Sequence, residues 1–263
     1  MPDQTPTNGL ADHSLRRARL LVDTDRLLGL DLTLIAAPPA KVPSPAASQP
    51  PPAPSPSLPK SSASSAKSAL LDEIRARHDA QCPHCTTATY HQRTVFGEGD
   101  PDARLMFVGE APGEEEDKTG RPFVGRAGQL LDKMITAMGL SRSAVYIANI
   151  LKSRPPNNAT PTPIEVARCS PYLAEQIRII RPEVIVALGA PSAKFLLQTE
   201  EGINKLRGQW WTTKVAGPDL EPIPVMPTYH PAYLLRAYTP ENRAKVWGDL
   251  QQAMQRLGLN AKS

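Results

Sequence analysis

The chain has 263 residues, three of them cysteines, and a net charge of +4. No apolar stretch is long enough to cross a bilayer, and charged residues interrupt the N-terminal region where a signal peptide needs an apolar core. Three cysteines, two of them in a C-x-x-C pair, are typical of a reducing compartment rather than of a secreted disulfide scaffold, so we expect a cytoplasmic protein. The mild basicity is compatible with a polyanionic partner.

Composition divides the chain into three parts. Residues 1–35 contain a short amphipathic pattern over 14–29, which is either a loosely held terminal helix or a peptide that binds a partner protein. Residues 36–69 are rich in Pro, Ala and Ser, and ten of the 29 prolines lie in 38–59. Such a composition cannot bury apolar surface, so we expect a disordered linker. We expect residues 70–263 to form one monomeric domain.

From residue 104 onward, short apolar runs alternate with helical patterns. The expected strands are 105–108, 145–148, 184–188 and 223–228, and the expected helices are 126–139, 163–180, 191–198 and 241–257. Strands that are apolar throughout are typical of a parallel sheet covered on both faces. With right-handed crossovers, the pattern predicts an α/β fold: a three-layer α/β/α sandwich with a central four-stranded parallel sheet.

The unusual residues fall in the loops that follow the predicted strands. Those loops are 109–123, 149–158, 189–193 and 229–236. Ligands of an open parallel sheet bind beyond the carboxyl ends of its strands. The sequence therefore predicts one site built from all four loops.

The first loop carries a carboxylate, several glycines and an aromatic ring. Glu110 follows the strand directly, so its carboxylate should face the crevice. Glycines such as Gly113 allow backbone N–H groups to approach a ligand closely. Phe123 offers a ring for stacking, or belongs to the core. Residues 114–117 are also typical of an acidic helix N-terminus.

The second and third loops offer an amide and phosphate-binding features. Asn149 can both donate and accept, as reading the edge of a pyrimidine requires, or it caps a turn. The stretch from Lys152 to Asn158, which includes Arg154, is extended and basic, which suits a phosphate backbone. In the third loop, Ser192 stands at a helix N-terminus, where it accepts a phosphate or caps the helix.

The fourth loop combines a histidine with two leucines and an arginine. His230 is expected to project into the crevice as a donor or acid, or to be structural. Leu234 and Leu235, expected in an exposed turn, resemble the apolar wedges that enter a base stack, with Arg236 on a phosphate. Their alternative is a cap on the core.

Two long motifs in the same order carry a family resemblance. They are Gly-Glu-Ala-Pro-Gly-x-x-x-Asp-x-Thr-Gly-x-Pro-Phe-Val-Gly and His-Pro-Ala-Tyr-Leu-Leu-Arg. From about Cys82 to its last helix, the chain resembles the iron–sulfur uracil-DNA glycosylases, family 4 of that superfamily. The resemblance implies a monofunctional base-excision repair enzyme that hydrolyses the N-glycosidic bond of uracil in DNA and leaves an abasic site. Residues 1–70 lie outside the resemblance; if the N-terminal segment binds a partner, we expect a replication or repair protein.

The resemblance also implies roles for the singled-out residues. Glu110 positions the attacking water or shapes the pocket, Phe123 stacks on the extruded uracil, and Asn149 reads its edge. His230 stabilises negative charge on the leaving ring. Some related glycosylases carry a water-activating aspartate where this chain has Ala111, which favours a dissociative mechanism here. The base pocket is expected to comprise Ala111, Gly113, Phe123, Asn149 and Asn158, and the DNA-binding surface Arg154, Ser192, Leu234, Leu235 and Arg236.

The cysteines depart from the family pattern. The family holds a 4Fe-4S cluster on four cysteines, and Cys82, Cys85 and Cys169 occupy three of these positions. Ser153 stands at the other, and a serine oxygen is a harder and weaker ligand than a thiolate. Four outcomes stay open: a cluster completed by serine or water, a three-iron cluster, a zinc ion on the cysteines with His84, or an empty site. Three merely structural thiols are a further reading.

Other functions fit less well. A relative that bonds covalently to the abasic product needs a reactive histidine in the loop after Asn149, and residues 150–163 contain none. A non-catalytic, cluster-bearing DNA-binding module of the replication or repair machinery would not need Glu110, Asn149 and His230. A nucleotide-binding α/β protein would carry a phosphate-loop motif, which this sequence lacks.

Overall fold

The computed structural model describes residues 62–259, apart from 214, 216 and 218–220. The expected helix over 14–29 and most of the expected linker lie outside the described residues. Within the described part, none of the helices is long and apolar enough to cross a membrane.

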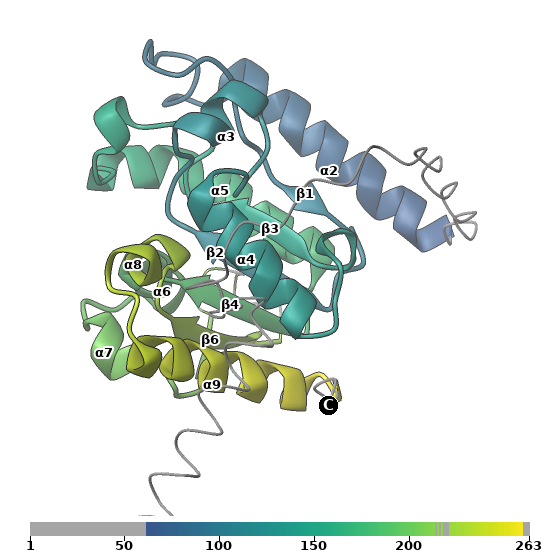
Figure 1. The fold of residues 1–263 in the computed structure, drawn as a ribbon. Helices are drawn as coiled ribbons and strands as arrows, with labels where there is room; N and C mark the ends of the chain where they lie inside the picture. Colours follow the sequence, from purple (N-terminus) through teal and green to yellow (C-terminus); the bar gives the residue numbers. More distant parts are fainter. Residues whose placement is uncertain (1–61, 214, 216, 218–220, 260–263) are drawn as a thin grey trace, which may run out of the picture.

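A six-stranded sheet in the order β1-β3-β2-β4-β6-β5 forms the centre of the molecule (Figure 1). Its four inner strands are mutually parallel: β3 (Tyr146–Asn149), β2 (Leu105–Gly109), β4 (Val184–Leu188) and β6 (Pro224–Thr228). They confirm the predicted parallel strands. Two short antiparallel edge strands, β1 (Glu98–Gly99) and β5 (Trp211–Thr212), extend the predicted sheet from four strands to six. The sequence did not reveal them because two residues are too few to show a strand period.

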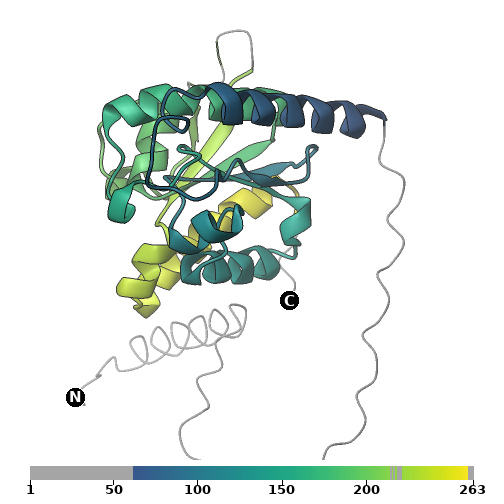
Figure 2. The ribbon, with the colours of Figure 1, turned by 90° about the horizontal axis from the view of Figure 1, so that it is seen from above.

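Helices cover both faces of the sheet, as Figures 1 and 2 show. On one face lie α2 (Ser62–Gln81), α5 (Pro163–Ile180) and α6 (Ala190–Leu197), and on the other α4 (Arg126–Ala137), α8 (Pro231–Arg236) and α9 (Pro240–Arg256). Successive strand side chains alternate between the two cores, because Met106 and Val108 pack with the first group and Leu105 and Phe107 with the second. The predicted three-layer sandwich is confirmed.

Short helices occupy the connections around the carboxyl edge of the sheet. They are α3 (Glu114–Thr119), the 3-10 turn η2 (Pro156–Asn158) and α7 (Ile203–Leu206), whereas the 3-10 turn η1 (Arg142–Ala144) directly precedes β3. The segment 231–236, expected as an exposed turn, is helix α8. Proline at its first position has the fixed φ that a helix start requires, which explains why the chain turns helical there.

Helix α2 begins at Ser62, so the expected domain boundary at residue 70 falls inside this helix. Leu71 and Ile74 bury their side chains in the core beside α5. Lys67 Nζ donates to Ile180 O at 3.1 Å, at the carboxyl end of α5. The helix therefore packs along the length of α5, and its last turn reaches the cysteine pair.

The strand order places a topological switch beside β2. From β2 the chain moves to β3 on one side and then crosses to β4 on the other side. The loops that leave β2 and β4 therefore diverge, which opens a crevice at the carboxyl ends of the strands.

Candidate active site

A cavity of about 690 Å³ lies at the carboxyl ends of the parallel strands. This volume is ordinary for a small-molecule site. The predicted site residues that line it are Glu110, Ala111, Gly113, Phe123, Asn149, Asn158, His230 and Arg236. The fold thus brings together residues that are more than a hundred positions apart in the chain.

Phe123 and Asn149 meet at the end of β2 because residue 109 has no side chain. A Cβ on Gly109 would lie 2.3 Å from Asn149 Oδ1 and 2.6 Å from Phe123 Cζ. The Phe123 ring also faces His230, with ring centroids 5.6 Å apart and planes inclined by 34°. An aromatic face, an amide and an imidazole therefore surround one space.

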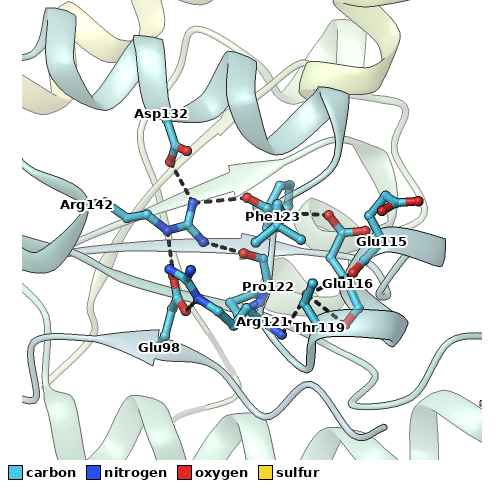
Figure 3. Close-up of polar contacts among 10 residues, drawn as sticks. Glu98, Glu115, Glu116, Thr119, Arg121, Pro122, Phe123, Asp132 and Arg142 are labelled. Carbon is cyan, nitrogen blue, oxygen red and sulfur yellow. Dashed lines mark hydrogen bonds and ion pairs between the residues drawn. The ribbon is translucent and has the colours of Figure 1, made fainter. Parts of the chain in front are cut away.

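The backbone of Phe123 is left-handed, with φ of 51°, and a cationic side chain holds it there. Arg142 donates to Phe123 O at 3.1 Å and to Pro122 O, and Figure 3 shows its guanidinium between these carbonyls and two carboxylates. Those carboxylates are Glu98, at 2.5 Å, and Asp132, at 2.6 Å. The strained residue is therefore fixed from the β1 edge and from α4 at once.

Glu116 secures the same loop from the other side. Its Oε1 accepts hydrogen bonds from the backbone N–H groups of Val124 at 2.7 Å and Gly125 at 2.8 Å, and its Oε2 accepts from Gly113 N at 3.1 Å. The acidic segment does open a helix, α3, as one reading of the sequence expected. Glu116 additionally holds the two ends of the loop, at Gly113 and at Val124–Gly125, close together. The sequence around Glu116 did not reveal this role.

Two buried oxygen atoms in the cavity have no hydrogen-bond partner within the described protein. They are Glu110 Oε1 and Asn149 Oδ1. Burial raises the pKa of the Glu110 carboxyl above its usual value. Buried polar atoms are nearly always hydrogen-bonded, so an unpaired pair in one cavity indicates that a polar ligand supplies their partners.

His230 caps helix α8 in a way that fixes its tautomer. Its Nδ1 accepts a hydrogen bond from Ala232 N at 3.1 Å. In the neutral ring the proton must then be on Nε2, which leaves Nε2–H free to donate. Burial, with a smaller contribution from Arg236, lowers the pKa of His230 to about 4. His230 is therefore a neutral hydrogen-bond donor at physiological pH.

The strand end before His230 is braced by side chains that sequence reasoning missed. Tyr229 donates its hydroxyl to Asn204 Oδ1 at 2.7 Å, and the Arg207 guanidinium lies 5.2 Å from the centre of the Tyr229 ring. Arg207 pairs with Asp249 at 2.6 Å, and Asp249 also accepts from the Thr228 hydroxyl at 2.6 Å. Helices α7 and α9 thereby fix the turn that aims the imidazole.

The residues expected to contact DNA separate into two groups. Leu235 is 36% exposed, but Leu234 is only 1% exposed and packs into the core, so only Leu235 of the two is available as a wedge. Ser192 is buried, and its hydroxyl donates to Gly189 O at 3.1 Å, which corrects its expected DNA contact. Arg154 donates to Asn158 Oδ1 at 2.8 Å, at the rim of the cavity.

The cysteines gather with a histidine that the sequence reading did not include. His78, Cys82, Cys85 and Cys169 are buried, and their ligand atoms all lie within 4.8 Å of one another. Although burial lowers the pKa of His78, its hydrogen bonds to Cys82 and Cys85 raise it to about 9. Hydrogen bonds from Cys169 and Cys85 lower the pKa of Cys82. The group is compatible with a metal centre.

The two other expected metal ligands behave differently. His84 is buried beside the group, but its nearest ionic partner is Glu165, 4.0 Å from Nδ1. It is not among the gathered donors, which corrects the reading that assigned it to a zinc ion. Ser153 is fully buried, and its hydroxyl oxygen lies 3.3 Å from Cys85 Sγ.

The comparisons with known proteins agree with this site. Residues 96–251 match the family model described as the uracil DNA glycosylase superfamily. The chain belongs to the uracil-DNA glycosylase superfamily. The family-4 resemblance is confirmed by the superfamily's curated type-4 members. The type-4 uracil-DNA glycosylase of Thermotoga maritima is 46% identical over 187 residues, which cover 70% of this chain and 93% of that protein.

Two further relatives delimit the position of the chain within the superfamily. The type-4 uracil-DNA glycosylase of Saccharolobus solfataricus is 42% identical over 193 residues, covering 72% of this chain and 85% of that protein. The type-5 uracil-DNA glycosylase of Pyrobaculum aerophilum is 33% identical over 161 residues, covering 56% and 69%. The similarity to type-4 glycosylases is therefore both higher and more extensive than the similarity to this type-5 relative.

Proposed function

We propose that the chain hydrolyses the N-glycosidic bond of uracil in DNA and leaves an abasic site. The observation that carries this proposal is the single cavity that holds a neutral imidazole donor, an unpaired amide oxygen, an aromatic ring and an unpaired carboxylate. A flat polar ring held between these groups would have one face on Phe123 and its polar edge toward Asn149.

His230 would supply the main electrostatic stabilisation of the departing base. Cleavage of the glycosidic bond builds negative charge on the departing base, and Nε2–H of His230 would donate to a base oxygen. That charge is absent from the bound substrate and develops as the bond breaks, so the hydrogen bond lowers the barrier rather than merely tightening substrate binding. A neutral donor also carries no positive charge that would need water around it before substrate enters.

Asn149 and Phe123 supply selection of the base. An amide can accept from a ring N–H through Oδ1 and donate to a ring oxygen through Nδ2, which matches the alternating edge of uracil. Because Gly109 has no side chain, the Phe123 ring can stand directly beside this amide. Base extrusion costs a few kcal/mol, which stacking on an aromatic ring offsets.

Glu110 is placed to act on the water that attacks the sugar. Its carboxylate, once ionised, would orient the water and stabilise the positive charge that develops on the sugar ring. The adjacent residue is Ala111, which has no proton-accepting group. We therefore propose a dissociative reaction in which the base departs first and a weakly activated water follows.

Opening of the duplex would rest on α8 and the loop after β3. Leu235 is an exposed apolar side chain of α8 that could fill the gap left by an extruded nucleotide. Arg236 lines the cavity and Arg154 lies at its rim, so both can contact flanking phosphates.

The metal centre would brace these loops rather than take part in the chemistry. Lys152 N donates to Cys169 Sγ at 3.2 Å, and Lys152 Nζ donates to Asn149 O at 2.8 Å. Lys152 therefore joins the donor group to the backbone of the residue that carries the base-reading amide. The family resemblance implies a 4Fe-4S cluster on four cysteines at this place, whereas the four donors that the structure gathers are His78 and three cysteines.

We further propose that the enzyme works as a monomer and that residues 1–35 recruit a replication or repair protein on the linker that follows. The Pro-, Ala- and Ser-rich composition of residues 36–69 supports a linker that tethers residues 1–35 to the domain. A pull-down with the full chain and with a chain in which residues 14–29 are scrambled would test recruitment, with uracil excision expected to be equal in both.

A single-turnover assay on a labelled duplex with one uracil tests the central proposal, with the thymine duplex as control. Wild-type enzyme should release uracil only. His230→Ala should slow release about a hundredfold to a thousandfold, as removal of an oxyanion donor does elsewhere. Glu110→Gln should slow it about tenfold to a hundredfold. The matched variant Glu114→Gln, on the exposed side of α3, should be unchanged.

Two results would contradict the proposal. Undiminished release by the His230 and Glu110 variants would remove the assigned roles. Tight DNA binding without any uracil release by the wild-type protein would instead identify a non-catalytic DNA-binding module.

A further inference from the structure

The buried donor group is assembled from two separate parts of the chain, residues 78–85 and helix α5. His78 lies in the last turn of α2, Cys82 and Cys85 follow that helix directly, and Cys169 comes from α5. His78 and Cys82 are four residues apart, and Cys82 N donates to His78 O at 2.9 Å, so one helical turn places both side chains on the same side. The helix thus delivers an imidazole into a group of thiols.

The orientation of His78 is that of a metal ligand. Its Nδ1 donates to Asp79 Oδ1 at 2.8 Å, and the same carboxylate accepts from the Thr94 hydroxyl at 2.8 Å. The other nitrogen, Nε2, lies 3.2 Å from Cys85 Sγ. A carboxylate that holds one imidazole nitrogen while the other faces thiolates is the arrangement that fixes the tautomer of metal-bound histidines.

Aromatic contacts fix the plane of this imidazole as well. The ring of Tyr172, on α5, packs edge-on against His78 at a centroid distance of 4.8 Å, and Phe96 lies 5.8 Å away. His78 has no exposed surface. Two aromatic rings and the Asp79 carboxylate therefore position the imidazole independently of any ion.

The spacing of the donors matches the ligands of one ion. Two thiolates on a tetrahedral zinc ion, with bonds of about 2.3 Å, are about 3.8 Å apart, and a thiolate and an imidazole nitrogen are about 3.5 Å apart. Here Cys85 and Cys169 Sγ are separated by 3.7 Å, and His78 Nε2 and Cys85 Sγ by 3.2 Å.

A 4Fe-4S cluster does not fit this spacing. Each of its four ligands binds a different iron, and the iron–ligand bonds radiate outward from the cluster. Each pair of ligand atoms is therefore farther apart than two neighbouring irons. Four donor atoms that all lie within 4.8 Å of one another leave no room between them for four irons and four sulfides.

Ser153 lies beside the donors in a supporting place. Its Oγ is at hydrogen-bonding distance from Cys85 Sγ, 3.3 Å, and Lys152 N donates to Cys169 Sγ at 3.2 Å. Hydrogen bonds to thiolates stabilise their negative charge, as metal-bound thiolates require. With an imidazole completing the set, a serine oxygen is not needed as a ligand.

We propose that His78, Cys82, Cys85 and Cys169 hold a single tetrahedral metal ion of the zinc type, with Ser153 outside its ligands. All four donors are buried, so the site is closed and structural rather than catalytic. The proposal stands apart from uracil excision, because it concerns the identity of the ion and its ligands, whichever reaction the cavity performs.

Metal analysis of the full chain tests the nuclearity. The protein is produced in medium that contains both iron and zinc, purified without oxygen, and assayed for metals and acid-labile sulfide. We expect about one zinc per chain, no sulfide and a colourless protein. About four irons with equivalent sulfide, in a brown protein, would overturn the proposal.

Three alanine variants test the ligand set. His78→Ala should lose the bound zinc, whereas His84→Ala and Ser153→Ala should keep it. His84 is the matched control, because it is a buried histidine between the two cysteines of the pair. Zinc retained by His78→Ala, or lost from Ser153→Ala, would refute the proposed ligands.

Cobalt(II) substitution separates a ligand from a merely structural histidine, should His78→Ala fail to fold. His78→Cys supplies a thiolate in place of the imidazole and should still bind one ion. The cobalt spectrum should then change from that of three sulfurs and one nitrogen to that of four sulfurs, while His84→Ala leaves it unchanged. An identical spectrum in wild type and His78→Cys would show that residue 78 does not bind the ion.

Discussion

His230 links the chemistry of the site to its stability, and a pH series can expose that link. Because burial lowers the pKa of His230 to about 4, the unfolded chain takes up this proton near its ordinary value of 6.5 while the folded protein resists it. The stability contribution is therefore complete above about pH 6.5 and declines as the pH falls toward 4. The loss from this group should be on the order of 3 kcal/mol.

Chemical denaturation of wild type and His230→Asn between pH 4.5 and 7.5 measures this effect. Asparagine can also cap a helix, so the variant keeps the N-cap of α8 without the titrating ring. The difference in unfolding free energy between the two proteins should shift in favour of the variant as the pH falls. A difference that is constant with pH would show that His230 titrates normally. Other acid-sensitive groups, including the metal ligands, are common to both proteins and cancel.

The neighbouring leucines of α8 should give opposite results when they are truncated. Leu234→Ala removes a fully packed core side chain and should cost about 2–5 kcal/mol of stability. Leu235→Ala should change stability by less than about 0.5 kcal/mol, because the side chain is at the surface. Leu235→Ala should instead lower activity. It should slow uracil release from duplex DNA more than release from single strands, because only a duplex leaves a stacked gap to be filled.

Thermal melts and single-turnover rates on both substrates measure the pair. Equal slowing on single and double strands by Leu235→Ala would argue against a wedge, and a stable Leu234→Ala protein would argue against its place in the core.

Among the secondary-structure elements, the loop between α3 and α4 depends on Arg142 for its conformation. Arg142→Gln would release the carbonyls of Pro122 and Phe123 and break the pairs with two carboxylates. Phe123 would then leave its left-handed conformation. Because misplacement of a stacking group by an ångström can cost about a hundredfold in rate, we expect excision to slow by tenfold to a hundredfold.

Arg121→Gln is the matched control for this experiment. Arg121 pairs with the same carboxylate, Glu98, but it is exposed and does not contact the Phe123 backbone. Single-turnover rates at saturating enzyme should therefore fall for Arg142→Gln and stay near wild type for Arg121→Gln. Equal losses would assign the effect to Glu98 and β1 rather than to the position of Phe123.

The elements that the sequence revealed are those with a strong local signal. Continuous apolar runs locate the four parallel strands, and the rule for parallel sheets is enough to place Glu110, Asn149 and His230 at one edge. Arg142 was missed because it lies in a three-residue 3-10 turn without a pattern. His78 was missed because it belongs to a largely polar helix, and its only local signal is the four-residue spacing to Cys82.

The whole molecule couples its two functional regions through one buried cation. The Lys152 amine donates to Asn149 O at 2.8 Å and to Gln176 Oε1 at 2.6 Å, and Gln176 Nε2 in turn donates to Phe96 O and Tyr146 Oη. These bonds connect β3, α5 and the chain before β1 beneath the cavity. Burial lowers the pKa of Lys152 and the nearby thiols partly oppose this shift, which leaves the pKa at about 8.

Lys152→Met tests whether this connection supports both regions. Methionine fills much of the same space but leaves Gln176 Oε1 and Asn149 O without their donor, which should cost about 1.5–3 kcal/mol for each lost bond to a charged group. Uracil release should slow because the carbonyl of Asn149 loses the donor that fixes the end of β3. The same substitution at the exposed Lys133 of α4 should leave both quantities unchanged.

Both variants are measured for unfolding free energy in denaturant, for single-turnover excision and for metal content. The metal content distinguishes two explanations for a loss of stability and activity. If Lys152→Met keeps its metal but is unstable and slow, the hydrogen bonds themselves carry the coupling. If it loses the metal as well, the amine also serves as the positive charge that balances the thiolates. Buried charges can be replaced by apolar groups without loss in some proteins. A fully stable and active Lys152→Met protein would show that this buried charge is also replaceable. It would contradict the proposed coupling between the donor group and Asn149.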